Sequence, residues 1–395
     1  AIVYVSGAGC YELSINGKAA HPDAVMEPGW SNIPPVRMLY RAYDVTGLLT
    51  GAARNVIGVR TGMCKYGFLG EYCQGGGPTE NANCRAVIMR LSLVYNDGSR
   101  KSVTTLPDGE WLTTTELDPV RFAHLYHGEV YDGRLEDGWN NVGYVVTEGW
   151  KPALAYANAH AEFGKLSLAE SPPIGILEGK AAISMTSLVR ANHTPAIIFD
   201  FGQNMAGFAT VSAPRGLAKG ARLVLKYAEV LKADGSAKMD FCPGDAEGGA
   251  ACHCADGLCA NQTDVYIARG DGEPETFAPH FTYHGYRYVQ LEGLDIDSFQ
   301  SGNVSLTAHL VASRLRPTGR VHFDDPAMEM LNRLQTAVHY TQATNFHHHP
   351  EDCPQREKRG WMGDAQVTSL QASLNFDTTS LYKQWIRAIR DDQTA

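Results

Sequence analysis

Chemically versatile side chains are concentrated in residues 351–364, Glu-Asp-Cys-Pro-Gln-Arg-Glu-Lys-Arg-Gly-Trp-Met-Gly-Asp, which hold four carboxylates, three cations and a tryptophan. Cleavage of a sugar–oxygen bond needs these residue types, because one carboxylic acid protonates the leaving oxygen while a second carboxylate activates water or attacks directly. An aromatic side chain would cover the apolar side of the sugar ring. A solvated charged loop ahead of a helix is an equal alternative from residue types alone, since charge runs usually lie at the surface.

Two local structures fit this segment. In a helix, Glu357, Trp361 and Asp364 would recur at i, i+4 and i+7 and share one face. Two glycines in the segment oppose a helix, because each costs about 1 kcal/mol inside one. The alternative is a loop that ends at Asp364 as the N-cap of a helix starting at Ala365. Either structure keeps the acids within one local patch.

The order of residues in this segment resembles a known signature. Asp-Cys-Pro-Gln-Arg-Glu (352–357), followed by Gly-Trp-Met-Gly-Asp-Ala (360–365), is similar to the catalytic motif of bacterial-type α-L-rhamnosidases, glycoside hydrolase family 78. Four further segments occur in the order that this family uses: Tyr-Glu-Leu-Ser-Ile-Asn-Gly-Lys (11–18), Gly-Glu-Val-Tyr-Asp-Gly-Arg-Leu-Glu (128–136), Asp-Phe-Gly-Gln-Asn-Met-Ala-Gly (200–207) and Phe-Thr-Tyr-His-Gly-Tyr-Arg-Tyr-Val (281–289). Together the matches cover nearly the whole chain.

The resemblance implies a role for each polar residue of the motif. Glu357 corresponds to the general acid, and Asp352 and Asp364 correspond to carboxylates that grip rhamnose hydroxyls. Trp361 would line the pocket, where apolar contact suits the methyl group of rhamnose. Arg356 is expected to bind substrate hydroxyls or Asp352 rather than Glu357, because a cation beside the acid would oppose the raised pKa that it needs. No cofactor and no metal are implied.

The resemblance also implies inversion of configuration, for which a general base must lie about 6.5–9.5 Å from the acid. No segment up to residue 395 matches the region that supplies this base, so we expect the chain alone to be inactive or barely active. Residues 1–5 already have the pattern of a buried strand, and residues 381–390 form an amphipathic helical pattern. Both observations predict a fragment that lacks the N-terminus and most of the catalytic domain.

The first three quarters of the chain have the pattern of β-structure, with short apolar runs broken by Gly, Pro and Asn. Asn16-Gly17 is a hairpin signal. Pro172-Pro173 marks a boundary, so we expect one β-sandwich over residues 1–175 and a second over residues 176–314.

Helical patterns follow. Asp325-Pro326 is a helix start, and apolar residues then recur at a spacing of about 3.6 residues. Residues 365–374 and 381–389 predict two further helices. The resemblance identifies residues 315–395 as the beginning of an (α/α)6 six-hairpin toroid, here truncated.

Two clusters invite a metal interpretation. Cys252-His253-Cys254 with Cys259 has the wrong spacing for a Cys-x2-Cys site and lies in a Gly- and Asp-rich surface pattern, so disulfides within that loop, joining Cys242, are favoured. Three consecutive histidines, 347–349, cannot all face one ion in an extended strand, so a polar loop is favoured there. The nine cysteines are an odd number, which leaves a free thiol, and Cys353 is the candidate.

The charge and composition of the chain limit the classes of binding partner and the cellular compartment that we expect. A net charge of −9 argues against nucleic acid, which favours a basic face. No apolar run approaches the ~20 residues that a membrane helix needs. Clustered loop cysteines and three Asn-x-Ser/Thr sequons, at Asn192, Asn261 and Asn303, favour secretion, with the cytoplasm as the alternative.

The sequence therefore predicts a hydrolase that releases terminal α-L-rhamnose from glycosides or polysaccharides. The alternative from another class is a non-catalytic carbohydrate-binding β-sandwich protein, or a degenerate paralogue. A glycosidase with another sugar specificity on the same toroid is a third hypothesis, which the 352–364 motif disfavours. An intact downstream barrel with a second acid would support the enzyme.

Overall fold

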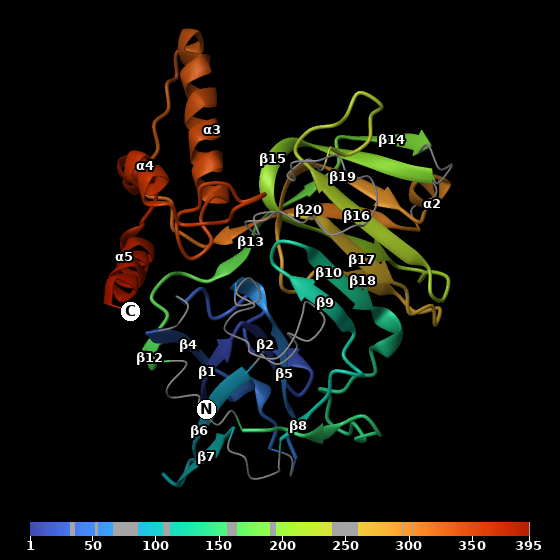
Figure 1. Cartoon of the computed structure of the whole chain (residues 1–395), viewed down its shortest axis with the longest axis vertical. Helices are drawn as coiled ribbons and strands as arrows, with labels where there is room; N and C mark the ends of the chain where they lie inside the picture. The colour runs from blue at the N-terminus through green and yellow to red at the C-terminus, as the bar shows by residue number, and fades with distance from the viewer. Residues whose placement is uncertain are drawn as a thin grey trace.

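The computed structural model describes residues 1–31, 36–51, 54–65, 86–105, 111–155, 164–189, 195–238, 260–294, 296–301 and 303–394. Within these residues, two β-structured parts are followed by three long helices at the C-terminal end (Figure 1). The predicted order, β-domains and then the first helices of a helical domain, is confirmed.

The first part is a sandwich of two sheets. One sheet has the order β12-β4-β1-β6-β7 and the other has the order β3-β2-β5. The strands are β1 Ile2–Ala8, β2 Cys10–Ile15, β3 Lys18–Ala19, β4 Arg37–Asp44, β5 Ile57–Gly62, β6 Ala86–Val94, β7 Arg100–Thr104 and β12 Lys165–Leu168, with a 3-10 helix η1 at Thr46–Leu48. Alternating apolar residues of both sheets, such as Val5, Leu13 and Met89, are buried in one core.

The second part is built on a ten-stranded sheet with the order β13-β20-β15-β19-β16-β17-β10-β9, to which β14 and β18 are joined through β15. Its strands are β13 Ile174–Ala181, β14 Ser184–Val189, β15 Pro195–Ala213, β16 Arg222–Ala228, β17 Thr263–Ile267, β18 Glu275–Phe277, β19 His284–Glu292 and β20 Ser305–Ser313. The first half of β15 pairs with β14 and its second half pairs with β18 and β20, while β19 pairs with residues of both halves. Its register shifts between Asp200 and Met205. One long strand therefore joins both halves of this part around a shared apolar core.

Residues 120–132 differ from the prediction. Strands β9 (Val120–His124) and β10 (Gly128–Asp132) were expected in the first sandwich, but β10 pairs in parallel with β17 of the large sheet. Alternation along a strand specifies its buried face and not its partner, so this crossover has no local signal. The predicted boundary near residue 175 stays a prediction. Between β10 and this boundary lie a 3-10 helix η4 at Gly133–Leu135 and the short strand β11 (Lys151–Pro152). Strand β11 pairs with β8 (Leu112–Thr113), which precedes β9.

The helices are α3 Glu329–Thr344, α4 Met362–Asn375 and α5 Thr379–Thr394, preceded by a short α2 at Ile296–Gln300 and a 3-10 turn η5 at Pro326–Met328. The predicted start at Asp325-Pro326 is confirmed, since the Asp325 carboxylate accepts the Ala327 N–H at 2.9 Å. The ends of the helices share a small core around Phe346 and Phe376. None of the described helices is both long and apolar enough to cross a bilayer.

Candidate active site

The chain between α3 and α4, residues 345–361, holds the catalytic motif, and it lies where the helices meet the β-structured parts (Figure 1). Helix α4 begins at Met362, with Trp361 in the N-cap position, so both predicted local structures were wrong. Glu357 lies in an irregular loop, and Asp364 lies inside the first helical turn rather than capping it. The exposed Asp364 carboxylate is favourable there, because the N-terminus of a helix carries partial positive charge.

Glu357 has its carboxylate at the mouth of this loop. Its Oε1 accepts a hydrogen bond from Arg356 Nη2 at 2.7 Å, and its Oε2 accepts one from the indole N–H of Trp361 at 2.8 Å. The Glu357 side chain is 16% exposed, while Trp361 is 46% exposed, and the Arg359 guanidinium lies over its ring at 5.9 Å from the centre. The structure therefore brings the predicted acid together with Trp361 and Arg356 on an accessible surface.

The expected direction of Arg356 was wrong. Its guanidinium pairs with Glu357 and not with Asp352. The oxygens of Asp352 already have donors, because Oδ1 accepts the Arg359 backbone N–H at 3.0 Å and Oδ2 accepts the Cys353 thiol at 2.8 Å. The adjacent carboxylate of Glu357 is the available anion for this cation. Arg356 thus covers one face of the acid.

Cys353 lies between the two carboxylates. Its sulfur accepts the Glu357 backbone N–H at 3.4 Å while the thiol donates to Asp352. Burial and the hydrogen bond to Asp352 raise the pKa of Cys353 to about 11, so the thiol stays protonated near neutral pH. The prediction that Cys353 is a free thiol is confirmed.

Asp352, Cys353 and Glu357 are also the described residues best placed to share a metal ion, with ligand atoms within 4.8 Å of one another. A cation there would have to replace the hydrogen bonds that the carboxylates of Asp352 and Glu357 already accept. One carboxylate oxygen of Asp352 thus lies within 4.8 Å of one oxygen of Glu357, closer than the about 6.5–9.5 Å that separates the two carboxyl groups of an inverting glycosidase.

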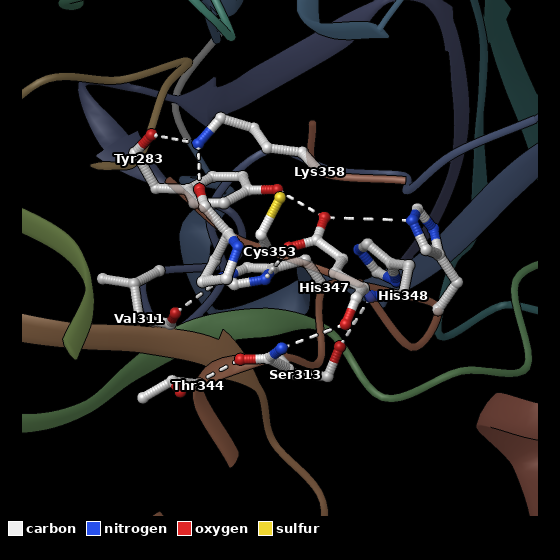
Figure 2. A network of polar contacts seen from close by, with 12 residues as sticks. Tyr283, Val311, Ser313, Thr344, His347, His348, Cys353 and Lys358 are labelled. Carbon is white, nitrogen blue, oxygen red and sulfur yellow. Dashed lines mark hydrogen bonds and ion pairs between the residues drawn. The ribbon is translucent and has the colours of Figure 1, made fainter. Parts of the chain in front are cut away.

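A buried polar network lies behind the loop (Figure 2). Glu351 accepts the Tyr283 hydroxyl at 2.6 Å and His347 Nδ1 at 2.9 Å, and His347 Nε2 lies 2.8 Å from the Val311 carbonyl oxygen. The two ring nitrogens of His347 thus each face an oxygen, one from the Glu351 carboxylate and one from the Val311 carbonyl. Burial raises the pKa of Glu351, but the interactions with His347 and with the Lys65 cation outweigh burial and lower it to about 2.

The other two histidines have separate surroundings. His349 Nε2 faces Lys65 Nζ at 2.9 Å, and burial together with that cation lowers the pKa of His349 to about 3, so its ring is neutral and accepts the bond. The buried His348 ring stands edge-to-face to Trp30, and its backbone N–H donates to Ser313 Oγ at 2.8 Å. His347 and His349 both face the Glu351 carboxylate, whereas the His348 ring packs against Trp30. The segment is an irregular loop, as predicted, and its three histidine side chains are buried.

Three side chains that hold the loop, those of Lys358, Lys65 and Tyr126, were missed by the sequence analysis. Lys358 Nζ donates to the Tyr283 carbonyl at 2.9 Å and to the Pro354 carbonyl. Lys65 Nζ donates to the Lys358 carbonyl at 2.7 Å, and the Tyr126 hydroxyl donates to the Glu357 carbonyl at 3.0 Å. Three of these contacts join residues that are 75, 231 and 293 positions apart. No local pattern in the sequence signals such pairs.

A disulfide was also missed. Cys10 and Cys64 are bonded, with their Cα atoms 5.7 Å apart, and this fixes the backbone beside Lys65. The disulfides predicted within residues 242–259 lie outside the described residues.

Comparison with known proteins identifies three consecutive family models along the chain. They are the alpha-L-rhamnosidase N-terminal domain at residues 1–178, the bacterial alpha-L-rhamnosidase concanavalin-like domain at 190–312 and the bacterial alpha-L-rhamnosidase 6 hairpin glycosidase domain at 322–395. A protein of Formosa agariphila named Alpha-L-rhamnosidase is 30% identical over 99% of this chain, and the chain spans 38% of its length.

Two solved structures are similar over almost all of the chain. The alpha-L-rhamnosidase from Dictyoglumus thermophilum matches 99% of the chain and 39% of its own, with a TM-score of 0.80 and 30% identity. The Streptomyces avermitilis alpha-L-rhamnosidase complexed with L-rhamnose matches 100% of the chain and 34% of its own, with a TM-score of 0.78 and 26% identity. The three models, the relative and the shared fold agree, and the chain belongs to the bacterial alpha-L-rhamnosidase family.

Proposed function

We propose that the complete gene product is a glycosidase that removes terminal α-L-rhamnose from glycosides or polysaccharides, with Glu357 as the general acid. The observation that carries this proposal is the position of Glu357. Its carboxylate is held at the surface by Arg356 and Trp361, in a segment similar to the six-hairpin glycosidase domain. One solved relative with this fold is described as complexed with L-rhamnose.

Each residue of the motif then has a task. Glu357 protonates the glycosidic oxygen as the bond breaks. Arg356, now paired with Glu357, exchanges that partner for substrate hydroxyls when the sugar enters. Asp352 and Asp364 accept hydrogen bonds from rhamnose hydroxyls, and the exposed face of Trp361 packs on the methyl side of the ring.

We propose an inverting mechanism whose base lies in the part of the gene product that follows these residues. Asp352 is too close to Glu357 to serve. Acid–base chemistry of this kind requires carboxylates and water, and no cofactor enters it. The 395-residue chain by itself is therefore expected to show little or no turnover.

The decisive experiment compares the complete gene product with its Glu357→Gln variant on 4-nitrophenyl α-L-rhamnopyranoside and on natural rhamnosides. Glutamine keeps the shape and removes the proton, so we expect activity in the parent and a loss of about 10²–10⁴-fold in the variant on unactivated rhamnosides. Proton NMR of the first-formed sugar tests inversion. A folded parent protein without activity on any rhamnoside would contradict the glycosidase proposal and favour the carbohydrate-binding hypothesis.

We also propose that the protein works in an oxidising compartment. The Cys10–Cys64 disulfide supports this, because such bonds persist mainly in secreted proteins. Cell fractionation, with thiol labelling of each fraction, tests it. Recovery of the native protein in the cytosol with both thiols free would contradict it.

A further inference from the structure

Glu357 and Lys358 are neighbours in sequence but point to opposite environments. The Glu357 side chain reaches the surface, whereas Lys358 is only 1% exposed. Lys358 has a φ of +52°, a left-handed conformation that is uncommon for a residue with a side chain. This conformation turns the backbone so that the acid faces outward while the amine faces the interior.

The Lys358 amine is fully engaged in that interior. It donates to the carbonyls of Tyr283 and Pro354 and lies 4.0 Å from the centre of the Tyr283 ring (Figure 2). Tyr283 immediately precedes β19, and Pro354 is within the catalytic loop. The amine therefore ties the loop both to itself and to the second β-structured part.

A second amine holds the same loop from the first sandwich. Lys65 Nζ donates to the Lys358 carbonyl at 2.7 Å and lies 5.1 Å from the Trp30 ring. The Tyr126 hydroxyl donates a hydrogen bond to the neighbouring carbonyl of Glu357. The backbone carbonyls of Glu357 and of the next residue, Lys358, are thus both held by side chains from distant parts of the chain.

Stability alone does not require amines at these positions. Burial lowers the pKa of Lys358 to about 7 and that of Lys65 to about 8, which shows that the environment disfavours their charge. Buried charged groups can often be replaced by apolar side chains of similar size without loss of stability. The directional bonds of these amines to the loop carbonyls are what an apolar side chain would not provide.

We propose that Lys358, supported by Lys65, is a positioning residue that holds the Glu357 carboxylate in place for proton transfer. This inference rests on the proposed function. General acid catalysis needs the donor within about 2.6–3.2 Å of the leaving oxygen, so a loop that shifts by a fraction of an ångström loses proton transfer before it loses substrate binding.

The test uses the complete gene product and the variant Lys358→Met, which keeps the chain length and removes the amine. Two substrates are compared, 4-nitrophenyl and methyl α-L-rhamnopyranoside. Nitrophenolate is a weak base that departs without a proton, whereas methoxide must be protonated as it departs. We expect kcat for the methyl glycoside to fall roughly tenfold or more beyond any fall for the nitrophenyl glycoside, with KM nearly unchanged.

Lys65→Met is the second variant, and it should move kcat in the same direction because it frees the Lys358 carbonyl. Lys226→Met is the matched control. That lysine pairs with Glu292 in the second β-structured part and makes no described contact with the loop, so both substrates should be unaffected. Glu357→Gln is the reference for the full effect. Loss of the acid itself must reduce kcat more for the methyl glycoside than for the nitrophenyl glycoside.

Hydrogen exchange of residues 352–361 gives a readout that does not depend on activity. We expect faster exchange in this segment for Lys358→Met and unchanged exchange in β1–β6. Equal loss on both substrates, or no loss on either while the parent is active and Glu357→Gln is impaired, would overturn the positioning role. If the parent is inactive, the proposed function fails separately, and unchanged exchange would overturn the anchoring of the loop.

Discussion

Glu351 is the anion at the centre of the buried network, and its replacement by Gln gives the sharpest test of that network. The side chain is fully enclosed and accepts from Tyr283 and His347. Its pKa is lowered from 4.5 to about 2, a difference that corresponds to about 3 kcal/mol. Glutamine resembles the protonated acid and removes the carboxylate that His347 and Lys65 stabilise. We expect the loop to lose about 3 kcal/mol of local stability at pH 7.

The pH dependence has a defined sign. Because the folded pKa is lower than the unfolded value, the stabilisation is fully present above pH 4.5 and is lost as the pH falls from 4.5 toward 2. The difference between the native protein and Glu351→Gln should therefore shrink through this window.

The assay is hydrogen exchange of peptides that span residues 346–361, corrected for intrinsic rates. At pH 7 the variant should exchange on the order of 100-fold faster, and the ratio should fall by pH 3. Glu292→Gln, which removes a carboxylate that pairs with Lys226 elsewhere, is the matched control and should leave these peptides unchanged. A ratio near one at pH 7, or a ratio independent of pH, would refute the assignment of Glu351 as a stabilising anion.

Three further predictions concern the first sandwich, the helical core and the thiol. Replacing both Cys10 and Cys64 by Ser removes a link between residues 54 positions apart and should destabilise the first sandwich by about 2–4 kcal/mol, measured by urea unfolding; an unchanged midpoint would show that the link does not constrain the unfolded chain. Phe346→Ala empties the fully buried centre of the helical core and should cost about 3–5 kcal/mol, with exchange rising first at the ends of α3 and α4; equal protection in both proteins would contradict that packing. Cys353 should react with iodoacetamide at pH 7 at least tenfold more slowly than free cysteine, because its pKa is about 11 and the thiolate is the nucleophile; a rate equal to that of free cysteine would be incompatible with the hydrogen bond to Asp352.

Much of the architecture was predictable because its signals are local. Alternation of apolar residues follows from the two-residue period of a strand, and the helix start at Asp325-Pro326 needs only a carboxylate and a fixed φ at neighbouring positions. Asn16-Gly17 adopts the positive φ angles of its hairpin for the same reason. The 352–364 motif likewise placed Glu357, Trp361 and Arg356 in one patch, since neighbours in sequence cannot be far apart in space.

The partners of that patch were decided by tertiary structure. The pairing of β10 with β17, the Cys10–Cys64 bond and the anchoring of the acid by Lys65 and Lys358 each join parts of the chain that local patterns do not connect. Composition marks a lysine as a surface residue by default, and only packing from two β-structured parts can bury its amine and supply carbonyl acceptors. Residue types and their spacing indicate which side chains could perform the chemistry. The tertiary structure decided which of them face the solvent and what holds them there, because strand pairing and burial depend on contacts between residues far apart in the chain.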